Sequence, residues 1–144
     1  MARLLWPAGV AIGLAAESVA FGWTEPRRWA PDLAVGWTFI GLGLVASDRW
    51  PENRTGPLLV LTGFGWFAGN FAAADLRIVA WLAGQTSFLY RGLLVHLVLA
   101  YPTGRLPGNM SRGVALLAYT VALVGPLRSS EFAAVGLGAL LLAG

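Results

Sequence analysis

The hydrophobic positions along the chain form long apolar runs that are separated by short polar segments. Six such runs cover residues 4–23, 31–47, 56–74, 86–101, 113–127 and 132–144. A helix that crosses a membrane needs about 20 largely apolar residues, with about 17 as the lower limit. The pattern therefore predicts an all-α, polytopic membrane helical bundle that forms one domain over residues 1–144.

The last apolar run is shorter than a membrane is thick. Residues 132–144 are all apolar or small, yet as a helix they cover only about 20 Å at 1.5 Å per residue. The hydrocarbon core of a bilayer is about 30 Å thick. We therefore expect five full spans and a sixth that is truncated, with the native chain continuing past Gly144. The alternative is a short terminal helix tucked into the bundle.

A more polar stretch, residues 75–84, separates the third run from the fourth. Leu76, Val79 and Leu82 fall on one helical face, whereas Arg77 and Trp81 fall elsewhere. This arrangement predicts a short helix that lies along the membrane interface.

Composition supports a membrane location, in which the lipid bilayer is the chief partner. The chain is 57% hydrophobic and only 12% charged, whereas soluble domains carry about 25% charged residues. All ten basic residues are arginines, and they lie mostly between the apolar runs. That distribution is typical of topology determinants, and no nucleic-acid partner is expected.

The arginines divide evenly between the two sides of the predicted bundle, so their number does not decide its orientation. The segment 102–111 turns on Pro102 and Gly104 and carries Arg105 without an acidic residue. This loop favours a multi-pass protein of the cell membrane whose N-terminus and 102–111 loop are cytoplasmic.

Polar residues inside the runs are the candidate ligand-binding or sensing groups. Glu17, Asn70 and His96 interrupt apolar helices, and Thr38 falls at a similar depth. Such residues usually face the interior of a bundle. For each, a purely structural hydrogen bond between helices is the alternative role, and we expect His96 to bond to Glu17 or Asn70.

Small residues at helical spacing mark the expected contacts between helices, because they let two backbones approach closely. The candidates are Gly9, Gly13, Gly65, Gly69 and Gly92.

Several kinds of chemistry are excluded by the residues that the sequence lacks. Without cysteine there can be no disulfide, thiolate metal site or iron–sulfur cluster. Without lysine there can be no retinal or pyridoxal Schiff base. A single histidine cannot supply a bis-histidine haem or a multi-histidine metal site. We therefore expect no cofactor, no metal and no catalytic residue.

The stretch "YRGLLVHLVLAYPTGRL", residues 90–106, resembles the N-terminal membrane region of the sensor histidine kinases common in actinobacteria. In that family an Arg-Gly-x-Leu-x-His helix is followed by Tyr/Phe-Pro-Ser/Thr-Gly-Arg-Leu. "DLAVGWTFIGLGLVA" (32–46) and "NRTGPLLVLTGFGWFAGNF" (53–71) are also similar, so the resemblance covers about residues 32–112. It implies a membrane input module with a cytoplasmic N-terminus that feeds a cytoplasmic kinase through its last helix. It also implies a homodimer formed through the kinase part and a response regulator as partner.

The phosphoacceptor helix and the ATP-binding boxes of that family are absent from these 144 residues, so no enzymatic activity is expected of them. His96 lies in apolar surroundings, where it is unsuited to phosphorylation by ATP. Two functions remain: a sensory module, or a stand-alone small membrane protein of transporter or carrier type. A transporter is expected to show an internal repeat or paired broken helices. The sequence has neither, which favours the sensory module.

Overall fold

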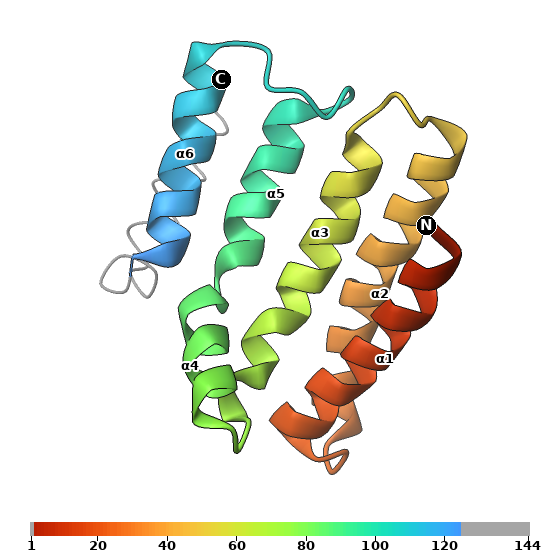
Figure 1. Cartoon of the computed structure of the whole chain (residues 1–144), viewed down its shortest axis with the longest axis vertical. Helices are drawn as coiled ribbons and strands as arrows, with labels where there is room; N and C mark the ends of the chain where they lie inside the picture. Colours follow the sequence, from red (N-terminus) through yellow and green to blue (C-terminus); the bar gives the residue numbers. More distant parts are fainter. Residues whose placement is uncertain (1, 125–144) are drawn as a thin grey trace.

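The computed structural model describes residues 2–124, which are helical and connected by short turns and loops (Figure 1). No strand occurs in this part of the chain, so the prediction of an all-α fold is confirmed. The elements are α1 (Ala2–Phe21), α2 (Pro26–Arg49), α3 (Thr55–Ala68), the 3₁₀ helix η1 (Gly69–Ala73), α4 (Arg77–Thr86), α5 (Leu89–Ala100) and α6 (Asn109–Leu123). The predicted run 132–144 and the last residues of the run 113–127 lie outside the described residues.

Within residues 2–124, three helical stretches are long and apolar enough to cross a membrane, which by length and composition indicates a membrane protein. They are Leu4–Phe21, Pro26–Arg49 and Arg77–Ala100, the last formed by α4 and α5 taken together. The helices α3 and α6 are shorter, with 14 and 15 residues. The structure thus differs from the predicted five full spans and a partial sixth by showing three stretches that meet both criteria.

The helix boundaries differ from the apolar runs for local reasons. The second helix starts at Pro26, ahead of the run at 31, because proline is preorganised for the first turn of a helix. The third run changes from α to 3₁₀ geometry at Gly69, where glycine and Asn70 have low helix propensity. Apolar run length therefore locates a helix without fixing its ends.

The stretch for which an interfacial helix is expected is occupied by α4. Only Ser87 and Phe88 separate α4 from α5, and α4 packs mainly against η1. The large side chains of Ile78, Trp81 and Leu82 are exposed.

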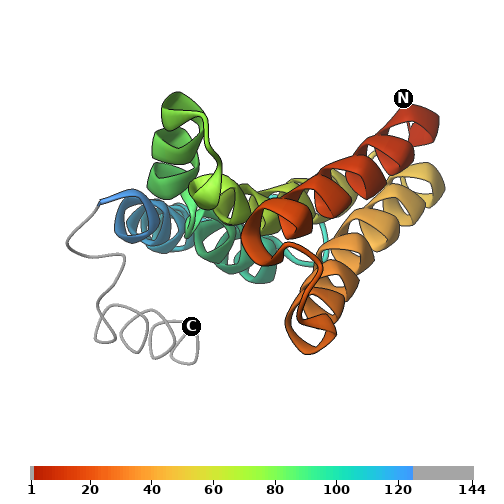
Figure 2. The same cartoon turned by 90° about the horizontal axis from the view of Figure 1, so that it is seen from below.

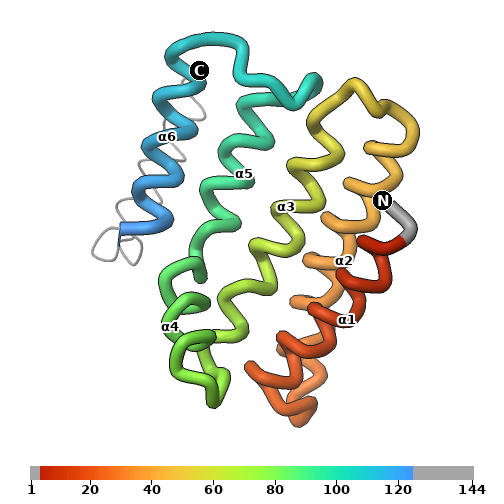
Figure 3. Tube along the Cα trace, in the orientation of Figure 1, coloured from red at the N-terminus to blue at the C-terminus, as the bar shows by residue number. Residues whose placement is uncertain are grey.

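The helices α2, α3, α5 and α6 stand side by side in a row, and α1 packs over α2 and α3 (Figures 1 and 2). One end of the bundle carries the start of α1, the α2–α3 turn and the α5–α6 loop; we call it the N-terminal end (Figure 3). The opposite end carries the α1–α2 turn and the η1–α4 connection. Polar groups gather at both ends, and the two sets are described separately below.

A close main-chain contact joins α2 and α3. A Cβ atom added at Gly43 would lie 2.7 Å from the carbonyl oxygen of Gly56, and one at Gly63 would lie 2.7 Å from that of Gly36. Neither position has room for a side chain, so glycine is what allows these two backbones to touch.

The buried side chains form one main cluster beside this contact, made by Ala16, Leu33, Ile40 and Phe67. A smaller cluster with Val95 and Ala118 lies between α5 and α6. Many large apolar side chains elsewhere stay exposed, as expected for helices whose outer faces meet lipid.

Four of the five glycines expected at helix contacts lie against another helix, and the fifth, Gly69, lies against the connection between α4 and α5. A Cβ at Gly9 would lie 2.9 Å from Ile40, one at Gly13 2.6 Å from Trp37, and one at Gly65 2.9 Å from Leu93. A Cβ at Gly69 would lie 3.2 Å from Ser87, and one at Gly92 2.6 Å from Tyr119. The indole nitrogen of Trp37 also donates to the carbonyl oxygen of Gly9 at 3.3 Å, which ties α2 to α1.

Candidate functional site

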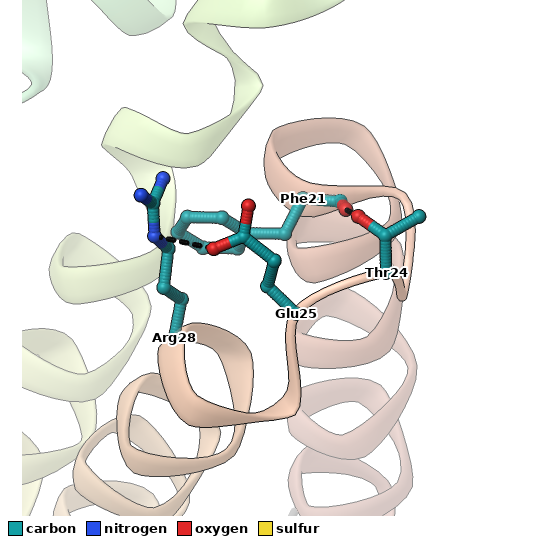
Figure 4. Close-up of polar contacts among 4 residues, drawn as sticks. All are labelled: Phe21, Thr24, Glu25 and Arg28. Carbon is teal, nitrogen blue, oxygen red and sulfur yellow. Dashed lines mark hydrogen bonds and ion pairs between the residues drawn. The ribbon is translucent and has the colours of Figure 1, made fainter.

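The α1–α2 turn brings Glu17 of α1 close to Asp32 of α2, and these residues carry the two carboxyl groups of the candidate site. Thr24 donates from its hydroxyl to the carbonyl oxygen of Phe21 at 2.9 Å, which closes the end of α1 (Figure 4). Glu25 then pairs with Arg28, Nε to Oε2, at 2.7 Å. Both side chains of that pair are more than half exposed, so it contributes at most about 1 kcal/mol. The turn serves mainly to run α2 back along α1.

Beyond this turn, four side chains from four elements form a hydrogen-bonded group. The amide nitrogen Nδ2 of Asn70 donates to Glu17 Oε1 at 3.1 Å and to Asp32 Oδ2 at 2.7 Å. The indole nitrogen of Trp66 donates to Asp32 Oδ1 at 2.8 Å. We call Glu17, Asp32, Trp66 and Asn70 the carboxyl–amide cluster. The Asn70 amide joins η1 to α1 and α2, and the Trp66 indole joins α3 to α2.

The cluster places two carboxyl groups in an apolar bundle. Glu17 is fully buried, and its second oxygen, Oε2, has no hydrogen-bond partner within residues 2–124. The donors that do reach the two carboxyl groups are a neutral amide and a neutral indole. Acidic groups inside a membrane protein are costly and usually mark a functional site. The cluster can therefore accept a proton or a hydrogen-bond donor at Glu17.

The described residues contain no group of three or more side chains that could hold a metal ion. The cluster itself supplies only two carboxyl groups and one amide. These groups offer hydrogen-bond donors and acceptors.

Aromatic contacts extend the cluster to α5. The ring of Trp66 meets that of Tyr90 edge to face, with 4.8 Å between the ring centroids. Arg91 donates from Nε to the Tyr90 hydroxyl at 3.4 Å and lies 4.4 Å above the ring of Phe88. A displacement of Trp66 would therefore alter its contact with Tyr90 in the first turn of α5.

Thr38 does not join the cluster. It lies on an exposed face of α2, and its hydroxyl donates to the carbonyl oxygen of Ala34 at 2.6 Å, within its own helix. A threonine that bonds to its own helix in this way needs no partner on another helix.

His96 does bond to a polar group on another helix, but the expectation of Glu17 or Asn70 as its partner is wrong. Its Nδ1 atom lies 3.1 Å from the hydroxyl of Tyr119, which joins α5 to α6. His96 lines a cavity together with Leu61, and Asn70 lies about 14 Å further along the third helix at 1.5 Å per residue. The histidine and the carboxyl–amide cluster therefore lie at different depths.

The N-terminal end holds a second polar arrangement, in which two turns dock against each other. The carbonyl oxygen of Pro102 accepts from Asn53 Nδ2 at 2.7 Å and from the Thr55 hydroxyl at 2.9 Å. The backbone N–H of Arg54 donates to the carbonyl oxygen of Thr103 at 3.2 Å. We call residues 53–55 and 102–105 the docked turns.

Gly104 makes this docking possible. Its φ of +71° lies in the left-handed region, and its backbone N–H donates to the carbonyl oxygen of Ala100 at 2.8 Å. A Cβ atom here would collide with the main chain of Arg54 and Thr55. Arg105, the next residue, projects an exposed side chain. The candidate turn residues Pro102, Gly104 and Arg105 thus belong to a loop that also packs closely against residues 53–55.

Five side chains of these sites were not among the sequence candidates: Asp32, Asn53, Thr55, Trp66 and Tyr119. Asp32 stands near the start of an apolar run, where an acid is easily taken for the edge of a span. Trp66 precedes Asn70 by one helical turn, which is the available indication that both face the same way. No comparable pattern marks Tyr119.

Comparison with known proteins gives no relative from which a function could be transferred. No family model, no curated protein and no solved structure matches the chain.

Proposed function

We propose that the chain is the membrane-embedded signal-input module of a sensor histidine kinase, with its N-terminus in the cytoplasm. It would pass a helix rearrangement to a cytoplasmic kinase outside these residues, which would supply the homodimer contact and the response-regulator partner. The observation that carries the proposal is that one helix, α3, leads from the docked turns at one end to the carboxyl–amide cluster at the other.

The length of this connection fits a membrane. The 14 residues of α3 at 1.5 Å and the five of η1 at about 2.0 Å add up to about 31 Å, close to the thickness of the hydrocarbon core. This length supports counting α3 with η1 as a further span, and so supports a polytopic bundle with more spans than the three long helices.

The carboxyl–amide cluster is the proposed input site. With the N-terminus inside, it lies near the outer surface, since Glu17 is about one turn from the end of α1. A proton or ligand at Glu17 changes which of its oxygens Asn70 can donate to. Because Asn70 also holds Asp32, that change alters the contact of three elements at once.

The docked turns are the proposed output end. They are formed by the "NRT" and "PTGR" segments, which lie in two of the stretches that resemble the kinase family. Their mutual contact gives those similar residues a common structural role, because each turn supplies the partner of the other. The second turn leads into α6 through residues 106–108.

A stand-alone transporter or carrier remains the second candidate. It is favoured by one observation, the buried Glu17 Oε2 without a partner in the described part of the chain, because proton-coupled carriers use such carboxyl groups.

The test uses the full-length gene product in lipid vesicles. We expect the gene to continue into a phosphoacceptor helix and an ATP-binding domain. Glu17→Gln and Asn70→Ala should change autophosphorylation several-fold, whereas the matched control Thr38→Val should not. A native gene without a kinase part, or equal rates in all variants, would contradict the proposal. Proton-driven solute uptake that is lost in Glu17→Gln would establish the carrier instead.

Orientation has its own test, because the chain has no native cysteine to interfere with labelling. Single cysteines at Gly108 and at Glu25 lie at opposite ends of the bundle. In intact cells we expect a membrane-impermeant thiol reagent to label position 25 and not position 108. The reverse pattern would overturn the cytoplasmic N-terminus.

A further inference from the structure

A cavity of about 790 Å³ opens at the N-terminal end, between α3, α5 and the first turn of α6. Its volume lies within the range of small-molecule sites, about 300–1,000 Å³. It is separate from the carboxyl–amide cluster, which lies at the other end of α3. None of the roles proposed above uses it.

The charged side chains that line this cavity are all arginines: Arg54, Arg105 and Arg112. They come from the α2–α3 turn, the α5–α6 loop and the first turn of α6, so folding brings together cations that are distant in sequence. Within residues 2–124 none of the three guanidinium groups forms an ion pair. Within residues 2–124 no aspartate or glutamate lines the cavity; Glu52 lines a neighbouring groove, together with Arg49 and Arg105. The cavity therefore carries uncompensated positive charge.

One wall of the same cavity is apolar. Pro57, Leu58 and Leu61 follow one another along the first turns of α3. This wall leads from the arginines toward the middle of the bundle, where His96 also lines the cavity. Leu61 is 54% exposed, so the wall is open to an apolar chain beside it.

We propose that this cavity binds an anionic phospholipid, with the phosphate held by Arg54, Arg105 and Arg112 and an acyl chain along Pro57, Leu58 and Leu61. Guanidinium groups match phosphate oxygens in charge and in hydrogen-bond geometry. Basic pockets between membrane helices near a bilayer surface bind such headgroups. A soluble phosphate would use the arginines alone, whereas the apolar wall continuous with them fits a lipid.

The site does not depend on the proposed signalling role or on the orientation. A bilayer has two surfaces, and each carries phospholipid headgroups. The arginines lie near one of these surfaces in either orientation of the bundle. A lipid in this cavity would touch both docked turns, through Arg54 and Arg105, and would brace α6 against α3 through Arg112.

The test is a binding titration of the full chain, purified in a neutral detergent, followed by native mass spectrometry. We expect phosphatidylglycerol to bind more tightly than phosphatidylcholine. Each of Arg54→Gln, Arg105→Gln and Arg112→Gln should weaken phosphatidylglycerol about fivefold, and the triple variant on the order of 100-fold. The matched control is Arg77→Gln, an exposed arginine at the opposite end, which should bind as the wild type does.

A second arm separates the lipid from a soluble anion. Glycerol phosphate should compete only weakly with phosphatidylglycerol for the cavity. Leu61→Gln should reduce the binding of phosphatidylglycerol and leave the weak binding of glycerol phosphate unchanged. Equal binding of both lipids, or an equal effect of Arg77→Gln, would overturn the site. Glycerol phosphate binding as tightly as the lipid would overturn the lipid as its occupant. The single variants, checked for helical content by circular dichroism, decide the outcome if the triple variant fails to fold.

Discussion

Replacing Gly104 by alanine tests whether the docked turns hold the N-terminal end of the bundle together. The substitution adds one methyl group at a buried position with φ +71°. That methyl group would collide with the main chain of Arg54 and Thr55, which belongs to the other turn. Main-chain atoms cannot move aside as a flexible side chain can, so the two turns have to separate.

The expected loss of stability has two parts. An alanine in the left-handed region costs about 1–2 kcal/mol. Separation of the turns also breaks the bonds from Asn53, Arg54 and Thr55 to the carbonyl oxygens of residues 102 and 103, each contributing about 0.5–1.5 kcal/mol. Gly104→Ala should therefore lower the free energy of unfolding by about 2.5–6.5 kcal/mol.

Two further glycines provide matched controls for the same chemical change. Gly22 also has a positive φ, +57°, but a Cβ there meets no atom within 4 Å, so Gly22→Ala should cost only the strain of about 1–2 kcal/mol. Gly113 is helical and equally open, so Gly113→Ala should gain about 0.5–1 kcal/mol from helix propensity. Unfolding is measured by titrating mixed micelles with a denaturing detergent. If Gly104→Ala is no more destabilising than Gly22→Ala, the docked turns do not contribute as described.

The remaining predictions use the same unfolding titration. Asn70→Ala should cost about 2–4 kcal/mol because the buried Glu17 loses its donor and the half-buried Asp32 loses one of its two, whereas Thr38→Val should change stability by less than about 0.5 kcal/mol; equal losses would contradict the cluster. His96→Leu and Tyr119→Phe should each cost about 0.6 kcal/mol and together little more than one alone, and fully additive costs would show that the two side chains are not coupled. Gly43→Ala should cost about 1–3 kcal/mol because its Cβ would lie 2.7 Å from two main-chain atoms of α3, and a cost near zero would refute the close contact of α2 with α3.

The helical class and the rough positions of the helices could be predicted from the sequence because both depend on local properties. An apolar run of sufficient length that lies in lipid must form a helix, because only then do its backbone N–H and C=O groups find hydrogen-bond partners within the run. The ends were less predictable, since Pro26 and Gly69 act through backbone geometry that hydrophobicity does not report.

The partners inside the bundle were only partly predictable, because they depend on how the helices are arranged. Glu17 and Asp32 stand at similar distances along the chain from the α1–α2 turn, and Asp32 and Asn70 at similar distances from the α2–α3 turn. In antiparallel neighbours such residues meet, so this symmetry could have revealed the cluster. The expected partners of His96 were wrong because it lies at another depth than the cluster, and because the sequence does not reveal that α3 separates α5 from α1.

The main-chain contact of α2 with α3 has a consequence for how relatives of this protein would be recognised. Four glycines set the distance between the two helices: positions 36 and 43 on one, and 56 and 63 on the other. Since main-chain atoms of the two helices touch at these points, the outward-facing residues of both helices can be exchanged for other apolar ones without changing that distance. Lineages descended from one ancestor would then retain two glycine pairs, each with a spacing of seven residues, after most other identities had been lost. Relatives of such a protein would be found by these glycine positions sooner than by their overall sequence identity.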